Sequence, residues 1–150
     1  MPERLLNDCA LPGTHHTRAG GVEACYVWHA QARTVHGQLT FRPDAEGLPG
    51  YVHGGALSAV ADEAMGLACW CEGFCAPGAQ VNTTFLHPVR VGDRGVIQAT
   101  LGEVQGRKLL CQAEILVGDV LVARTTGVFV SIPLDDPAPF AEWPGVTRFR

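Results

Sequence analysis

The chain is 150 residues long, and 47% of its residues are apolar while only 17% are charged. An average soluble domain carries ~25% charged residues, so this chain has little charge with which to coat a large free surface. Its length fits one domain with its own core, and we predict a single domain over residues 1–150. A net charge of −4 without a polybasic block argues against nucleic-acid binding, and the apolar content excludes disorder.

The N-terminus lacks the apolar stretch of a secretion signal, and no apolar run approaches the ~20 residues that cross a bilayer. We therefore expect a soluble cytoplasmic protein with no membrane partner. The six cysteines are then expected to be reduced thiols. Cys69, Cys71 and Cys75 are clustered, but their spacing is not typical of a zinc site. The sequence therefore predicts neither a metal nor a cofactor.

Glycine and proline divide the chain into short segments. Residues 1–21 are expected to be irregular. Loose alternation of apolar and polar residues then predicts half-buried strands over 22–32 and 34–41, followed by a loop over 42–50.

The segment 54–71 has a different character, because it is rich in Ala and Leu and contains few β-branched residues. Such a composition favours a helix. Since the segment is apolar nearly all round, we predict a buried helix rather than one lying on a surface. Its 18 residues give it a length of ~27 Å.

After the helix, the period of the pattern returns to two. Four further strands are predicted, with short connections that favour an antiparallel sheet, over 79–86, 95–104, 109–117 and 120–132. Residues 133–150 are rich in proline and are expected to form a loose tail. The fold class predicted from these elements is α+β, with two strands, one buried helix and about four antiparallel strands.

The start of the predicted helix is the richest candidate site. His53 is followed by Gly54 and Gly55, which leave the backbone N–H groups of the first helical turn accessible. Those groups and the helix dipole favour negative charge and can polarise a carbonyl. The same residues also fit a simple turn with a structural histidine.

Asp62 and Glu63 lie within the apolar helix. A carboxylate there is costly to bury unless it is paired or functional, and burial makes it a stronger base. Ser58 lies one turn before Asp62 on the same side of the helix, which makes it a candidate for contacting a substrate. Glu63 points about 100° away from Asp62, so we expect the two carboxyl groups to face different atoms. An exposed polar stripe is the alternative interpretation.

The sequence resembles the hot-dog-fold thioesterases of the PaaI-like, phenylacetate-pathway type. His53-Gly54-Gly55 followed by Asp62 is similar to that family's helix motif. The segment 81–88 with the Gly-Asp turn at 92–93 is similar to the family's strand after the helix, and 120–127 is similar to its last strand.

The resemblance implies a hot dog, in which an antiparallel sheet of five to six strands wraps around one long helix. It also implies a homodimer or homotetramer with active sites at subunit interfaces, and acyl-CoA or acyl-carrier thioesters as substrates. Asp62 would be the nucleophile or general base, with Glu63 as the second candidate carboxylate. The N–H of Gly54 or Gly55 would polarise the thioester carbonyl, and His53 would orient the loop or the substrate.

Two positions depart from the family pattern. Gly47 stands where some relatives have Asn, and the segment 77–79 offers no hydroxyl where some have Ser or Thr. A non-catalytic acyl-CoA-binding sensor and a hot-dog hydratase or dehydratase are the alternatives to the thioesterase.

Basic residues are expected near the site, because coenzyme A carries phosphates. The candidates lie at two turns, with Arg107 and Lys108 at one and Arg90 or Arg94 near the other. Ordinary solvation of turns accounts for them equally well.

Overall fold

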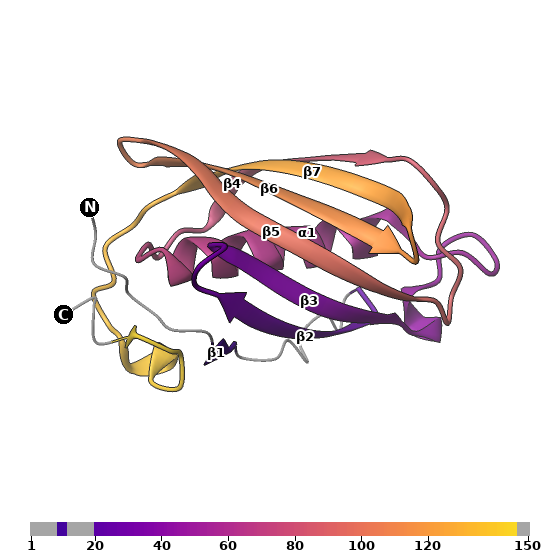
Figure 1. Ribbon diagram of the computed structural model, residues 1–150, viewed down its shortest axis with the longest axis horizontal. Coiled ribbons are helices and arrows are strands. Elements are labelled where there is room, and N and C mark those ends of the chain that lie inside the picture. The colour runs from indigo at the N-terminus through magenta and orange to yellow at the C-terminus, as the bar shows by residue number, and fades with distance from the viewer. Residues whose placement is uncertain (1–8, 12–19, 147–150) are drawn as a thin grey trace.

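The computed structural model describes residues 9–11 and 20–146 (Figure 1). An antiparallel sheet of seven strands curves around one long helix, which confirms the predicted hot dog. The strand order across the sheet is β1-β2-β3-β5-β6-β7-β4. The strands are β1 (Cys9–Ala10), β2 (Val22–His29), β3 (Thr34–Phe41), β4 (Gly78–Phe85), β5 (Arg94–Gln105), β6 (Lys108–Val117) and β7 (Val120–Val130).

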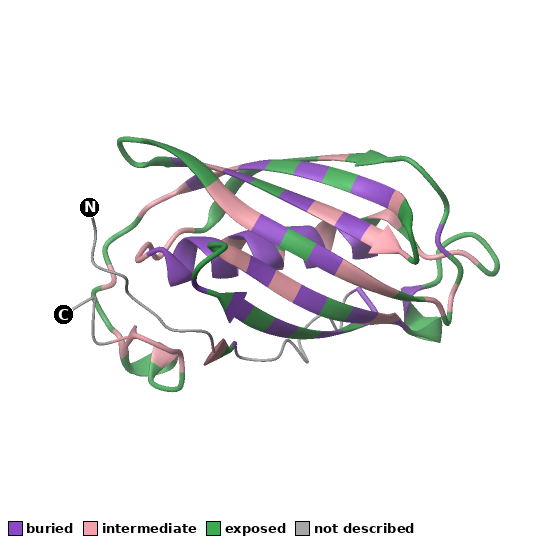
Figure 2. Cartoon of the chain, in the orientation of Figure 1, coloured by how far each residue is buried: buried purple, intermediate pink, exposed green. Residues whose placement is uncertain are grey.

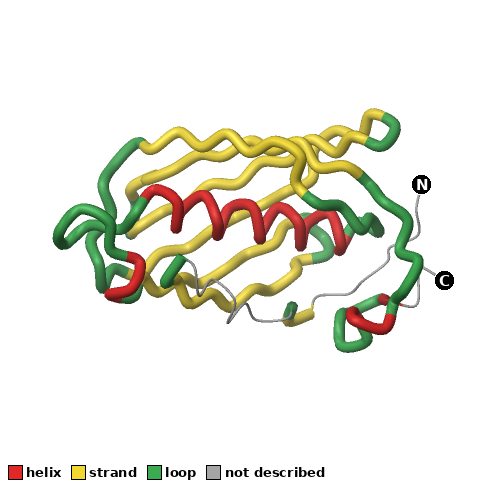
Figure 3. The backbone as a smooth tube through the Cα atoms, turned by 180° about the vertical axis from the view of Figure 1, so that it is seen from behind, coloured by secondary structure: helices red, strands yellow, loops and turns green. Residues whose placement is uncertain are grey.

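The helix α1 (Gly54–Cys71) has the bounds that its composition predicts. It lies across the concave face of the sheet, with strands behind it along its whole length (Figure 3). Its buried side chains include small alanines as well as Leu57, Met65 and Trp70, so the sheet approaches the helix closely. The helix ends at Cys71 with Glu72 as its C-cap, and Gly73 follows with φ of 99°, a conformation that favours glycine.

The strands are half-buried, as their alternating pattern predicts, and the stripes on β2, β3 and β5 display this alternation (Figure 2). In β2, every inward side chain from Val22 to Trp28 is buried, and every second residue is exposed. Strand β4 differs, because it forms one edge of the sheet and nearly all of its residues are exposed.

The sheet has one strand more than the predicted five to six. The added strand β1 pairs with β2 and lies in the segment that was expected to be irregular. Residues 1–8 and 12–19 of that segment lie outside the described residues. Strand β2 also stops at His29, and β7 stops at Val130, each slightly short of its predicted end.

The prediction of a loose C-terminal tail is wrong for residues 133–146. This segment contains a short 3₁₀ helix, η3 (Ala138–Phe140), and it packs on the end of α1. The ring of Phe140 stacks on Trp70 at a centroid distance of 5.2 Å, and Trp143 meets Trp70 edge-on at 4.9 Å. Aromatic burial fixes the segment, which its proline content had concealed. Residues 147–150 lie outside the described residues.

A second short 3₁₀ helix, η2 (Pro43–Ala45), precedes the loop that leads into α1. None of the described helices is long and apolar enough to span a membrane.

Candidate active site

His53 caps the N-terminus of α1. Its Nδ1 accepts a hydrogen bond of 2.8 Å from the N–H of Gly55, and its carbonyl accepts one from Ala56. Of the two N–H groups that the sequence offers for polarising a carbonyl, that of Gly55 is therefore already engaged. The N–H of Gly54 has no hydrogen-bond partner within the described part of the chain. Of the two, the Gly54 N–H is thus the one left unengaged among the described residues.

The loop before the helix holds His53 in place through backbone hydrogen bonds. The N–H of His53 donates to the carbonyl of Ala45 at 2.7 Å, and that of Val52 donates to Val89 at 2.8 Å. Gly47 packs directly against His53, since a Cβ at this glycine would lie 3.0 Å from the His53 Cα. The departure from Asn to Gly at this position therefore lets the histidine pack where a side chain would otherwise press against it.

Asp62 projects from the exposed side of α1, two turns beyond the N-terminus. Its carboxylate accepts no hydrogen bond from any described residue. Partial burial raises its pKa above the ordinary value, which makes it a stronger base. A Cβ at Gly78 would lie 2.8 Å from the Asp62 Oδ1, so the first residue of β4 faces this carboxylate. The position that lacks a hydroxyl in this sequence is therefore the one beside Asp62.

Glu63 and Asp62 line the same cavity. The volume of this cavity is about 450 Å³. The two carboxyl groups therefore line one cavity, while the expectation that they face different substrate atoms stays a prediction. The pKa of Glu63 is raised to about 7, chiefly by burial. A hydrogen bond from Tyr26 opposes the shift, and the negative charge of Asp62 adds to it. The Tyr26 hydroxyl donates to the Glu63 Oε2 at 3.2 Å.

Ser58 does not face this cavity. Its hydroxyl donates to Thr83 of β4 at 3.0 Å, and Thr83 in turn shares a hydrogen bond of 3.0 Å with Thr125 of β7. Three hydroxyls thus join the helix to two strands, and Thr125 is buried. The Ser58 hydroxyl is engaged within the fold, while its role toward a substrate stays a prediction.

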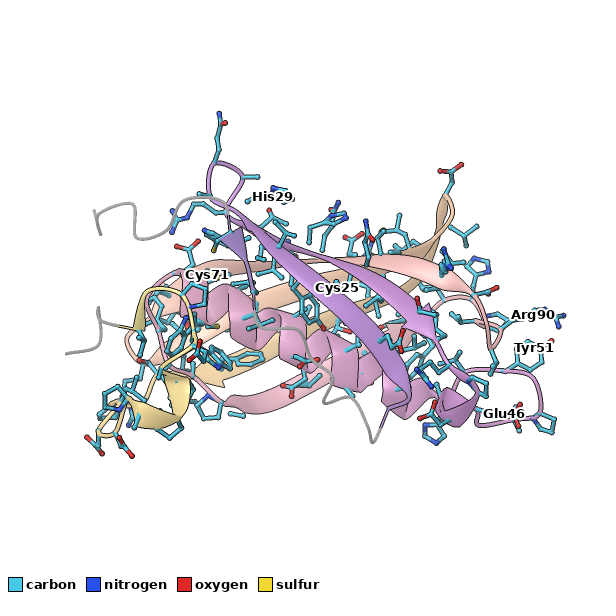
Figure 4. All side chains as sticks on the ribbon, turned by 90° about the horizontal axis from the view of Figure 1, so that it is seen from below. Cys25, His29, Glu46, Tyr51, Cys71 and Arg90 are labelled. Atoms are coloured by element: carbon cyan, nitrogen blue, oxygen red, sulfur yellow. The ribbon has the colours of Figure 1, made fainter. Side chains whose placement is uncertain are left out.

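The basic candidates lie at opposite ends of the molecule. Arg90 stands over the ring of Tyr51 at 5.2 Å, close to the start of α1, and Figure 4 shows both far from Cys71 at the other end. Arg107 and Lys108 lie at the hairpin between β5 and β6, where the Arg107 Nε donates to the Ser131 carbonyl at 3.1 Å. Of Arg90, Arg107 and Lys108, Arg90 is therefore the one near the start of the helix, and Arg94 follows the same turn as the first residue of β5.

The six cysteines are all free thiols. Cys69 of α1 and Cys111 of β6 lie in contact, with their sulfur atoms 3.3 Å apart, and both are buried. This contact and burial raise the pKa of Cys69, so its thiol stays protonated. Over residues 9–11 and 20–146, no group of three or more His, Cys, Asp or Glu side chains is placed to hold a metal ion.

Three features of the site are not predicted from the sequence, namely the hydrogen bond from Tyr26 to Glu63, the contact of Gly78 with Asp62, and the hydroxyl chain through Thr83. Each joins residues that are distant in the sequence. The missing hydroxyl over 77–79 was the single sequence signal that pointed to one of them.

The fold and the helix motif define a member of the thioesterase superfamily. The family model of the thioesterase superfamily matches residues 49–125, so the chain belongs to this superfamily. The chain is 33% identical over 92 residues to acyl-coenzyme A thioesterase THEM4 of Bos taurus, covering 60% of this chain and 38% of that protein. It is 28% identical over 118 residues to acyl-coenzyme A thioesterase THEM5 of Homo sapiens, covering 76% of this chain and 48% of that protein.

Solved structures share the architecture. A point mutant of the phenylacetic acid degradation protein PaaI from Thermus thermophilus superposes with a TM-score of 0.66 at 26% identity, covering 77% of this chain and 97% of that one. The PaaI protein of E. coli superposes with the same TM-score of 0.66 at 22% identity, covering 77% and 83%, and supports the fold alone. The chain spans about half or less of the length of the curated relatives it matches.

Proposed function

We propose that the chain hydrolyses acyl-CoA, or acyl-carrier, thioesters to a free acid and a thiol. The observation that carries the proposal is Asp62, a carboxylate of raised pKa that no described side chain engages and that opens on a cavity. Such a group is available to act as a base or a nucleophile. The names of the curated relatives, which are acyl-coenzyme A thioesterases, agree with this chemistry.

The distance between the two halves of the site supports a composite active site. Gly54 and Asp62 are eight residues apart on one helix, which separates them by ~12 Å along its axis. A donor and a base that act on one thioester carbonyl must both lie within ~3 Å of the reacting atoms. We therefore propose that the Gly54 N–H of one subunit acts together with Asp62 of another.

Strand β4 offers the surface for such an assembly. It is an exposed sheet edge with unpaired backbone groups, and Val81 and Phe85 are exposed along it. Both ends of the site lie against it, because Gly78 faces Asp62 and a Cβ at Gly54 would lie 3.0 Å from Phe85. We propose a homodimer through β4, from which a homotetramer is built by pairing dimers. The low overall charge fits this covered surface.

In the proposed reaction, the thioester carbonyl accepts a hydrogen bond from the Gly54 N–H. Asp62 removes a proton from water, the hydroxide adds to the carbonyl carbon, and the C–S bond then breaks to release the thiolate. Direct attack by Asp62, which gives a mixed anhydride that water hydrolyses, is the second route. We propose that Arg90 binds a coenzyme A phosphate, and its position over Tyr51, three residues before α1, supports this role. The cytoplasm is the proposed compartment, and six free thiols support a reducing environment.

A second candidate function is an acyl-CoA-binding sensor without turnover. The observation that favours it is the absence of a hydroxyl beside Asp62, where Gly78 stands. A thiol-release assay with a panel of acyl-CoAs separates the two functions, because the sensor binds without releasing thiol. A hydratase would instead add water to an enoyl-CoA without releasing thiol.

The interface is tested by Val81→Glu, which places a charge on the β4 edge. We expect a monomer in sedimentation and a loss of thiol release, with Val104→Glu at an exposed hairpin as the matched control. A fully active monomer would contradict the composite site.

A further inference from the structure

The cavity beside Asp62 runs along the helix rather than across it. Its helical wall consists of residues spaced by one helical turn on one face, Asp62, Glu63, Gly66, Leu67 and Trp70. The spacing from Asp62 to Trp70 corresponds to ~12 Å along the helix axis. The cavity is therefore a channel about two turns long, with the proposed base at one end.

The channel is polar at one end only. Its two charged side chains, Asp62 and Glu63, lie at the start of the helical stripe. Beyond them the walls are apolar, with Phe129 and Ile132 opposite the helix. A ligand that fits this distribution carries its reacting group at one end and an apolar chain behind it. The volume of about 450 Å³ lies within the ~300–1,000 Å³ typical of small-molecule sites.

Gly66 makes the middle of the channel wide. Apart from the helix's own backbone and the two chain neighbours, the only described group that a Cβ at this position would meet within 4 Å is the Phe129 Cε1, at 3.7 Å. Glycine in a helix interior costs ~1 kcal/mol relative to alanine, which stable helices normally avoid. Gly66 thus widens the channel, although glycine at this position does not stabilise the helix.

The C-terminal segment closes the far end. Phe140 and Trp143 both line the channel and both pack on Trp70, and they meet each other edge-on at 5.2 Å. The Trp70 Nε1 donates to the carbonyl of Pro144 at 2.8 Å, which ties the segment to the helix. This end wall lies outside residues 49–125, the part that the superfamily model matches, except for Trp70 itself.

We propose that the channel binds the acyl chain of the thioester, and that Trp70, Phe140 and Trp143 form a wall that limits it to medium length. An extended alkyl chain advances about 1.25 Å per carbon, given C–C bonds of ~1.5 Å at ~111°. A channel of ~12 Å therefore accommodates an acyl chain of about eight to ten carbons. This inference rests on the proposed hydrolase activity and adds the substrate class and the residues that select it.

Two variants test the length limit from opposite sides, with kcat/KM measured on acyl-CoAs of two to sixteen carbons. Trp143→Ala opens the end wall, and we expect the ratio of sixteen-carbon to eight-carbon activity to rise about tenfold or more. Gly66→Leu blocks the middle, and we expect the ratio of eight- and ten-carbon activity to acetyl-CoA activity to fall about tenfold or more. Val104→Ala, at an exposed hairpin, is the control.

A binding measurement separates this inference from the proposed function. Two of the three tryptophans, Trp70 and Trp143, line the channel, whereas Trp28 lies in β2. Decanoyl-CoA added to Asp62→Asn protein should change the tryptophan fluorescence saturably, and the added change Gly66→Leu should abolish the response. If no acyl-CoA is hydrolysed but this response holds, hydrolysis is refuted and the channel assignment stands. If thiol is released with an unchanged length profile in both channel variants, the channel assignment is refuted and hydrolysis stands.

Discussion

Glu63→Gln tests whether the second carboxyl group of the site is held in a desolvating cavity. Burial raises the pKa of Glu63 from 4.5 to about 7. Between these two pH values the folded protein therefore keeps a proton on Glu63 that the unfolded chain has already released. The stability that this proton contributes is fully present below pH ~4.5 and is lost as pH rises through ~7. Glutamine keeps the shape and accepts the Tyr26 hydrogen bond, but it carries no charge at any pH.

The magnitude follows from the shift. Each pKa unit is worth ~1.4 kcal/mol, so the ionised carboxylate lowers the free energy of unfolding by at most about 3 kcal/mol. Solvent in the open cavity screens the charge and reduces this to roughly 1–2 kcal/mol. The stability of Glu63→Gln relative to the unsubstituted protein should therefore be higher by roughly 1–2 kcal/mol at about pH 8 than at about pH 5.

The assay is urea unfolding at both pH values and at one fixed protein concentration, because assembly also affects stability. Glu103→Gln, at an exposed position outside this cavity, is the control and should show no pH-dependent difference. If Glu63→Gln shifts stability equally at both pH values, or not at all, the carboxyl group is not desolvated as the structure describes.

Three further substitutions test the remaining contacts of the site. His53→Ala removes the cap on the Gly55 N–H and should lower the free energy of unfolding by about 1 kcal/mol in urea, and an unchanged midpoint would contradict the capping role. Gly78→Ala places a Cβ against the Asp62 carboxylate and should reduce kcat with little change in stability, so full activity would show that the carboxylate's position is immaterial. Thr83→Val breaks the hydroxyl chain and should cost about 1–3 kcal/mol by thermal or urea unfolding, whereas a neutral effect would mean that the hydroxyls gain nothing from one another.

The helix was predictable with its bounds because its signals are local. The helix begins at the two glycines after His53, and the apolar residues up to Cys71 predict that it is buried. The motif also placed the proposed base, Asp62, and the proposed donor, the Gly54 N–H, on one element. The strands were predictable because each alternates, although their ends depend on pairing partners that a single segment does not reveal.

The parts that escaped prediction depend on contacts between distant segments. Tyr26 reaches Glu63 across 37 residues, and the angle between neighbours on a helix gave no indication that one cavity holds both carboxyl groups. The C-terminal aromatics were hidden in a proline-rich stretch, because composition describes backbone preference and not what a side chain such as Trp143 finds to pack against.

Asp62 is the proposed base or nucleophile of thioester hydrolysis, and its removal is the most direct test. Thiol release from an eight-carbon acyl-CoA should fall about 10²-fold or more in Asp62→Asn, the range expected when a general base is lost. Asp119→Asn, at an exposed hairpin turn, should retain full activity. An Asp62→Asn protein that folds normally and keeps the full hydrolytic rate would contradict the account.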